Sequence, residues 1–149
     1  MAVADFTRAR DRLRRLDDAD PDLTATLEAT QAALHDVATF SWGALMTVDP
    51  DTLLPTGGMV EGFEAEACAP FWDNELLAPG YNKFTDLARS NTSVATLYEA
   101  TDGDLDRAPI YTNLYSQLGV ADELRAAFVA GTRCWGVVSL LRALDDGPF

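Results

Sequence analysis

Apolar residues in the first forty positions recur every three or four residues, which is the period of one face of a helix. The first such stretch covers residues 5–17. A second begins after a break, where Asp20 has the residue type of a helix N-cap and Pro21 suits the first helical position. The sequence therefore predicts two helices within residues 1–39.

The second predicted helix carries a narrow apolar seam whose members step along the chain by four and three residues. Such a seam can pack on the protein's own sheet, or it can also serve as the face of a homodimer. The pattern leaves both interpretations open. The residues that would form the dimer face are Leu23, Leu27, Leu34 and Val37.

After these helices the apolar period changes from helical to alternating, which is typical of β-strands. Residues 40–48 and 54–61 are predicted as two strands connected by a turn at 49–52. Gly57 and Gly58, inside the second strand, indicate a bulge or a close approach by another group.

The rest of the chain alternates short helical and extended patterns. One helix is expected between residues 64 and 79, with an apolar face formed by Cys68, Phe71, Trp72, Leu76 and Leu77. Helices are also expected at 82–90 and at 108–118, where Gly119 ends the second of them. Strands are expected at 93–98, 123–130 and 133–144, the last two joined by the hairpin loop Gly131-Thr132.

This order of elements predicts an α+β fold. We expect an antiparallel sheet of five to six strands flanked by helices, with two N-terminal helices before it. With 149 residues, 48% of them hydrophobic, the chain has the size and composition of one domain. Within it, residues 1–39 form the N-terminal helices, and residues 40–149 form the sheet and its inserted helices.

The acidic charge of the chain disfavours nucleic acids as direct binding partners. It has 24 acidic and 11 basic residues and a net charge of −13, so it repels the phosphate backbone of nucleic acids. No apolar run approaches the roughly 20 residues that span a bilayer. The arginine-rich N-terminus lacks the apolar stretch of a secretory signal. We therefore expect a cytoplasmic protein in which this chain contacts neither membrane nor nucleic acid.

Residues for catalysis or metal binding are scarce in this sequence. The single histidine, His35, has no nucleophile at a recognisable spacing. Cys68 and Cys134 are both expected to be small buried hydrophobic residues and not redox-active thiols. The acidic loop 102–106 lacks the glycine and glutamate that a calcium loop needs at its sixth and twelfth positions. We expect no enzymatic activity, no metal and no cofactor.

Aromatic residues gather in the middle of the chain, above all between the second and third predicted strands. Each of them alone is most simply a core residue, whereas together they favour a cavity for a small molecule. Glu61 and Asn82 would supply polar contacts to such a ligand. The candidate ligand-binding residues are Glu61, Phe71, Trp72, Tyr81, Asn82, Phe84, Tyr98, Tyr111 and Tyr115.

Five segments together resemble the N-terminal sensor domain of certain bacterial LuxR-type transcriptional regulators. The segments are residues 49–58, 71–75, 82–88, 122–128 and 134–140. The likeness extends from about residue 35 to the C-terminus. These sensors are similar to GAF domains, which fold as a six-stranded antiparallel sheet with helices on both sides.

The resemblance implies a small-molecule sensor that acts through a C-terminal helix-turn-helix domain. That DNA-binding module is absent from this chain, so DNA contact is expected to belong to a part of the regulator beyond it. The family supplies no catalytic residues and no common ligand. The alternative is a ligand-free module of the same regulator that serves for dimerisation, and the two roles are compatible in one homodimer.

Overall fold

The computed structural model describes residues 3–149, which divide into two compact units, one that ends at Phe40 and one that comprises Ser41–Phe149. The first unit is a pair of helices, α1 (Val3–Asp17) and α2 (Leu23–Val37), that pack on each other. The Arg12 guanidinium ties them together by donating to Asp36 Oδ2 from Nε at 3.3 Å and from Nη2 at 3.2 Å. Both predicted N-terminal helices are therefore present.

The start of α2 differs from the sequence prediction. Asp22, not Asp20, is the N-cap, and its side chain accepts a hydrogen bond from the Ala25 N–H at 2.8 Å. Asp20 has a φ of 47°, in the left-handed region, whereas an N-cap residue requires extended backbone. Since Asp20 occupies the turn that reverses the chain, the next aspartate takes the capping role and Pro21 lies outside the helix.

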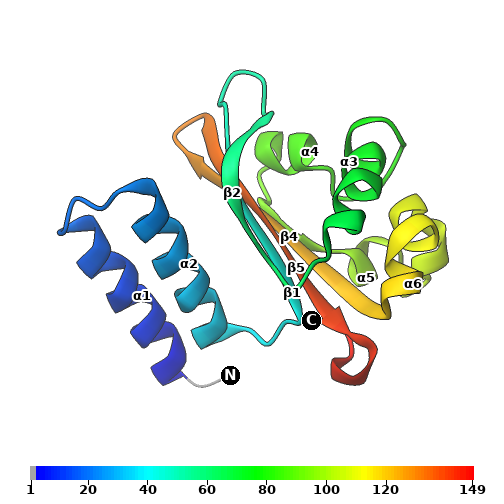
Figure 1. Cartoon of the computed structure of the whole chain (residues 1–149), viewed down its shortest axis with the longest axis horizontal. Coiled ribbons are helices and arrows are strands. Elements are labelled where there is room, and N and C mark those ends of the chain that lie inside the picture. The colour runs from blue at the N-terminus through cyan, green and yellow to red at the C-terminus, as the bar shows by residue number, and fades with distance from the viewer. Residues whose placement is uncertain (1–2) are drawn as a thin grey trace. The chain divides into compact units, whose positions relative to one another are not determined.

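The second unit is built on one antiparallel sheet of five strands, in the order β2-β1-β5-β4-β3 (Figure 1). The strands are β1 (Trp42–Val48), β2 (Pro55–Glu61), β3 (Val94–Thr96), β4 (Val120–Ala130) and β5 (Arg133–Ala143). The two longest strands, β4 and β5, form the predicted hairpin around Gly131-Thr132 and lie next to each other in the sheet. The α+β prediction with its antiparallel sheet and two N-terminal helices is confirmed.

Short helices pack on one face of this sheet, on the side shown by α3, α4 and α6 in Figure 1. Between β2 and β3 come η1 (Ala65–Ala67), α3 (Cys68–Leu76) and α4 (Phe84–Arg89). Between β3 and β4 come α5 (Leu97–Ala100), η2 (Leu105–Arg107), the π-helical turn η3 (Tyr111–Tyr115) and α6 (Ser116–Leu118). A last turn, η4 (Leu144–Asp146), follows β5. Gly119 ends α6 with a φ of 71°, as the sequence predicted.

The paired glycines of β2 show why a residue without a side chain is needed there. A Cβ atom on Gly58 would lie 2.5 Å from the Leu45 carbonyl oxygen of β1, and the φ of Gly58 is 157°. The pairing of β1 with β2 also shifts register between Thr47 and Val48. The predicted close approach is therefore made by the neighbouring strand itself.

The structure differs from the prediction at the end of β3 and along one face of α3. The predicted strand 93–98 ends at Thr96, because the Thr96 side chain caps α5 by accepting from the Glu99 N–H at 3.2 Å. In α3 the predicted apolar face is only partly buried. Phe71 and Asn74 face the core, whereas Leu76 and Leu77 are exposed. The amide of Asn74 bonds across to η3, which turns this face of the helix inward.

The two cysteines also differ from each other. Cys134 is buried in the sheet, as expected, but Cys68 is exposed, which corrects the prediction that both are buried. Cys68 opens α3 immediately after η1, at the rim of the helical layer rather than under it. None of the helices in residues 3–149 combines the length and the apolar character that a membrane crossing requires.

Candidate functional site

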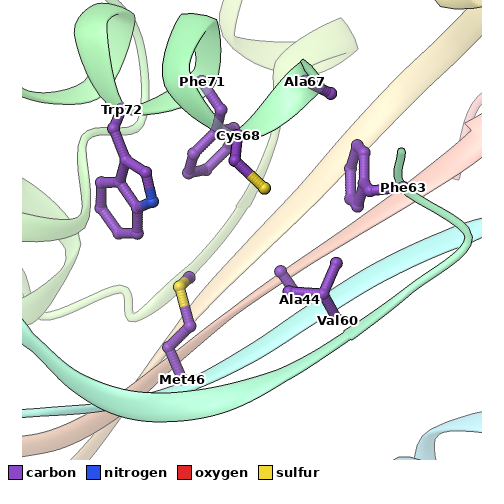
Figure 2. Close-up of a pocket in the computed structure, with 8 residues that line it drawn as sticks. All are labelled: Ala44, Met46, Val60, Phe63, Ala67, Cys68, Phe71 and Trp72. Atoms are coloured by element: carbon purple, nitrogen blue, oxygen red, sulfur yellow. The ribbon is translucent and has the colours of Figure 1, made fainter. Parts of the chain in front are cut away.

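The structure contains an apolar pocket between the β1–β2 pair and the η1–α3 segment (Figure 2). Alternation along β1 turns Ala44 and Met46 to the same face, and α3 supplies Phe71 and Trp72 from the opposite side. The cavity has a volume of about 50 Å³. Its lining residues are Ala44, Met46, Val60, Phe63, Ala67, Cys68, Phe71 and Trp72.

One polar group faces this pocket, the indole N–H of Trp72. Figure 2 shows the indole nitrogen on the side of the ring that is turned toward Phe71 and Met46. Among the hydrogen bonds of the described residues, none uses this N–H. Tryptophan commonly places such a donor where the rest of its ring is in apolar surroundings. The pocket thus offers one donor within walls of carbon and sulfur.

The size of the pocket limits what it can hold in this conformation. A cavity of about 50 Å³ admits a few water-sized groups, whereas pockets for drug-sized ligands measure roughly 300–1,000 Å³. A short apolar group with one hydrogen-bond acceptor fits the chemistry of the walls. A larger ligand requires α3 to move away from the strands.

A cluster of buried charges lies at the other end of α3. Arg125 on β4 has a side-chain exposure of 2%, and its two carboxylate partners, Glu75 and Glu123, are 5% and 2% exposed. Arg125 Nη1 donates to Glu75 Oε2 at 2.5 Å, and its Nε donates to Glu123 Oε1 at 2.8 Å. The guanidinium also lies over the rings of Phe84, at 4.6 Å, and Phe71, at 5.5 Å.

Two hydroxyl groups complete the surroundings of Glu123. Tyr115 Oη donates to Glu123 Oε1 at 2.8 Å, and Ser139 Oγ lies 2.5 Å from the same oxygen. Burial, followed by the negative charge of Glu123, raises the pKa of Tyr115 well above its ordinary value, so the phenol keeps its proton. Burial lowers the pKa of Arg125, but Glu123 and the other anionic neighbours raise it by more, so the guanidinium stays charged.

Glu75 connects this cluster to the elements around α3. Its Oε1 accepts the backbone N–H of Phe84 at 2.9 Å, which fixes the start of α4. Lys83 Nζ donates to the backbone carbonyls of Asn74 and Glu75, the latter at 2.7 Å, and so caps the C-terminal end of α3. Burial lowers the pKa of Lys83, while the nearby Glu75 carboxylate opposes that change.

Asp122, three residues before Arg125 on β4, is a second buried junction. Its Oδ1 accepts the backbone N–H groups of Tyr98 and Glu123, both at 2.8 Å, and its Oδ2 accepts the Phe149 N–H at 3.1 Å. Burial raises the pKa of Asp122 despite these three hydrogen bonds. One carboxylate therefore holds the start of α5 and the C-terminal segment to the same strand.

The candidate ligand-binding residues from the sequence separate in space. Phe71 and Trp72 line the pocket. Phe84 and Tyr115 are buried in the core, while Tyr81 and Tyr111 pack against it. Asn82 serves the framework instead, because its Nδ2 donates to the Thr96 carbonyl at 2.9 Å. Tyr98 is exposed at α5, and Glu61 lies in β2, outside the lining of the pocket.

Sequence reasoning missed most of the residues that form the site. The alternation of β1 carried a usable signal for Ala44 and Met46, which share one face of the strand. The charged cluster carried another, since Glu123 and Arg125 stand two positions apart in the predicted strand and so share one of its faces. Two charges on one inward face of a central strand indicate buried partners. Glu75, distant in sequence, carried no such signal.

Two other kinds of site, a metal centre and a dimer face, can be compared with the geometry. Among residues 3–149, no group of three or more histidine, cysteine, aspartate or glutamate side chains could hold a metal ion. Of the proposed dimer-face residues, Leu23 is exposed, while Leu27, Leu34 and Val37 are partly buried.

Comparison with known proteins gives one informative result. No family model matches the chain, and no curated protein matches it. Among solved structures, the crystal structure of the VqsR LBD domain from Pseudomonas aeruginosa is similar, with a TM-score of 0.55. The alignment covers 91% of this chain and 79% of that domain at 14% sequence identity. At this level of identity, the comparison shows that the two chains share a fold.

Proposed function

We propose that this chain is the small-molecule-sensing domain of a bacterial LuxR-type transcriptional regulator, of the GAF-like kind that the sequence resembles. The observation that carries the proposal is the apolar pocket under α3, with the free indole N–H of Trp72 turned into it. The similar structure, an LBD or ligand-binding domain, supports the same function. The state of the pocket would pass to an attached helix-turn-helix domain.

The lining of the pocket selects the class of ligand. It contains no charged side chain, so a charged ligand would lose its hydration without gaining a partner. A neutral, mostly apolar molecule with a carbonyl or ether oxygen would bury its carbon atoms and accept a hydrogen bond from Trp72. The proposal assigns no catalytic step to the site, because the only nucleophile in the lining is the Cys68 thiol and no base lines the pocket beside it.

The proposal places the regulator in the cytoplasm and leaves DNA contact to the attached domain. The net charge of −13 favours this division, since an acidic chain repels the phosphate backbone. A ligand can transmit a signal only if it binds one arrangement of α3 better than another.

Cyclopentanone is a suitable probe because it is small, mostly apolar and carries one carbonyl acceptor. In ¹⁵N-labelled protein, titration should shift the indole N–H resonance of Trp72 in a saturable manner. Trp135, exposed on β5, is an internal control and should stay unchanged. The Trp72→Phe variant assigns the resonance and should weaken binding. A titration in which Trp72 does not respond, or responds only as much as Trp135, would contradict the proposal.

A second candidate function is dimerisation by the N-terminal helices, without a ligand. The observation that favours it is exposed apolar surface on this unit, with Phe6 at 53% and Leu23 at 52% exposure. We expect the double variant Leu27→Asp, Leu34→Asp to be monomeric by light scattering if this face joins two copies. Thr24→Asp, on an exposed position of α2, is the control. An unchanged mass for the double variant excludes this face.

A further inference from the structure

We propose that Glu75 is the positioning residue that couples the pocket wall to the C-terminal segment of the chain, through Arg125 and Asp122 on β4. This inference rests on the proposed function, because it describes how occupancy of the pocket would be transmitted. It depends on three connected contacts, all within the unit Ser41–Phe149.

The first contact joins the pocket to the charged cluster through one short helix. Phe71 and Trp72 line the pocket, and Glu75 follows about one turn later on α3. A displacement of α3 that widens the pocket therefore acts directly on the Glu75 carboxylate. That carboxylate is held by Arg125 Nη1 at 2.5 Å and by the Phe84 N–H at 2.9 Å.

The second contact runs along β4. Arg125 and Asp122 are three residues apart on this strand, about 10 Å at the rise of an extended chain. Between them, Glu123 binds Arg125 through its side chain and donates its own backbone N–H to Asp122 Oδ1. Asp122 in turn accepts the Phe149 N–H at 3.1 Å and the Tyr98 N–H at 2.8 Å.

The third contact closes the C-terminal segment onto β5. Arg142 Nη1 donates to the Pro148 carbonyl at 2.7 Å, and its guanidinium lies 4.4 Å from the centre of the Phe149 ring. Residues 148 and 149 are thus held by two neighbouring strands, with Asp122 on one and Arg142 on the other. A change at Asp122 alters one of these two attachments.

The partners that a second arrangement of the cluster would need are already close by. Arg125 can keep Glu123 through Nε and the Asn82 carbonyl, 3.3 Å from its Nη1, even when Glu75 withdraws. A withdrawn Glu75 has a second cation close by, because the Lys83 Nζ already contacts the backbone carbonyl of Glu75. If Glu75 exchanges Arg125 for Lys83, each carboxylate still has a cation. The exchange therefore avoids the high cost of an unpaired buried charge.

Amide hydrogen exchange on the full chain tests this coupling without any ligand. Glu75→Gln keeps an oxygen acceptor for the Phe84 N–H but removes the charge that holds Arg125. We expect it to speed exchange at Tyr98 and Phe149 about 10-fold, which corresponds to about 1.4 kcal/mol of opening free energy. Amides of β1 should change much less. Asp73→Asn, an exposed carboxylate on the same helix, is the matched control and should leave all rates unchanged.

Two results overturn the inference. The first is that Tyr98 and Phe149 exchange at the same rate in Glu75→Gln as in Asp73→Asn. The second is that β1, Tyr98 and Phe149 all accelerate by the same factor, which would show general destabilisation. If Glu75→Gln fails to fold, Lys83→Met replaces it, because it removes the alternative partner of Glu75. In that variant we expect the Tyr98 and Phe149 rates to lose their response to cyclopentanone, and a retained response overturns the inference.

The probe separates this inference from the proposed function. A Trp72 indole that shifts with cyclopentanone, while Tyr98 and Phe149 keep their exchange rates, overturns the coupling and leaves the pocket in place. A Trp72 indole that does not shift overturns the proposed function. The comparison of Glu75→Gln with Asp73→Asn still decides whether α3 and the C-terminal segment are coupled.

Discussion

The two ends of α3 meet opposite kinds of interior. Near Phe71 and Trp72 the helix faces a carbon-lined cavity of about 50 Å³. Near Glu75 it faces charges and hydroxyls, with a cavity of only about 10 Å³ beside them. No buried side-chain nitrogen or oxygen among the described residues lacks a hydrogen-bond partner. The dispersion contacts around the carbon-lined cavity are individually weak. In the charged cluster, the loss of a single partner leaves a buried charge unpaired and costs several kcal/mol of stability, on the order of 3–5.

This difference suggests how one short helix can serve two purposes. The apolar end can separate from the strands gradually, losing roughly 25 cal/mol for each Å² of apolar surface exposed. The charged end cannot separate gradually in this way, because each buried carboxylate must keep a cation or hydrogen-bond donors. A sensor domain needs a pocket that can widen around a ligand. It also needs contacts that differ between the free and the bound state.

Removal of the Arg125 cation should lower the stability of the charged end of α3 more than any other substitution considered. Arg125→Met leaves Glu75 and Glu123 buried without their cation, and we expect a loss of about 3–5 kcal/mol in the free energy of unfolding. Arg133→Met is the matched control, since Arg133 pairs with Asp51 at 2.7 Å on the exposed surface. Its loss should stay below about 1 kcal/mol. Urea denaturation of both variants measures the difference, and equal losses would show that the cluster is not specially costly to disturb.

The hydroxyl that supports Glu123 should have the next largest effect. Tyr115→Phe removes a fully buried donor to a carboxylate, which we expect to cost about 1.5–3 kcal/mol of stability. Tyr98→Phe, at an exposed position, should change stability by less than about 0.5 kcal/mol. If the Tyr115→Phe protein is as stable as the wild type, the hydroxyl of Tyr115 does not stabilise the cluster.

The same tyrosine predicts a dependence on alkaline pH. Its pKa is raised in the folded protein, so the unfolded chain releases this proton at lower pH than the folded chain does. The stabilising contribution is complete below the ordinary tyrosine pKa of 10.0 and is lost as pH rises above it, by up to about 1.4 kcal/mol per pH unit. The stability difference between wild type and Tyr115→Phe should therefore shrink above pH 10. A constant difference would contradict this assignment.

The strand pair under the pocket offers a comparison between neighbouring glycines. Gly58→Ala would place a Cβ atom 2.5 Å from the Leu45 carbonyl oxygen, and we expect it to cost about 1–3 kcal/mol. Gly57→Ala meets only Thr47 Oγ1 at 3.4 Å, an ordinary contact. Thermal unfolding of the two variants separates the effects, and similar melting temperatures would argue against the close approach of β1.

Filling the pocket should have the smallest effect on stability and a clear effect on binding. Ala67→Leu adds carbon atoms to the pocket lining, and we expect a stability change below about 1.5 kcal/mol. Cyclopentanone should then cease to shift the Trp72 indole resonance. Ala130→Leu, on the exposed hairpin, is the control and should leave the titration unchanged. Normal binding to Ala67→Leu would place the probe elsewhere.

The sequence predicted the sheet better than it predicted the site, for physical reasons. Alternation is a local property, so β1, β2 and the β4–β5 hairpin followed from periodicity and turn residues. Capping depends on which of two neighbouring residues has the required backbone conformation, and residue type alone does not separate Asp20 from Asp22, which caps α2. The pocket and the cluster join residues far apart in the chain, such as Glu75 with Arg125, and only the folded sheet brings them together.

Aromatic content was an incomplete guide to the ligand site. It correctly drew attention to α3, where Phe71 and Trp72 lie, but most other aromatic candidates pack in the core or at the surface. Burial of a ring is common to pockets and cores. Small residues define this pocket equally well, because Ala44 and Ala67 leave the space that a larger side chain would fill.

A crystal structure under xenon pressure tests the central claim most directly, since xenon enters dry apolar cavities and scatters strongly. We expect one well-occupied xenon site among Met46, Phe71 and Trp72. The hollow at the β4–β5 hairpin, beside Phe128 and Trp135, is larger at about 370 Å³ but lies open at the surface, and we expect no ordered xenon there. Xenon absent from the pocket under α3, or present only at the hairpin, would contradict the proposal that this pocket receives the ligand.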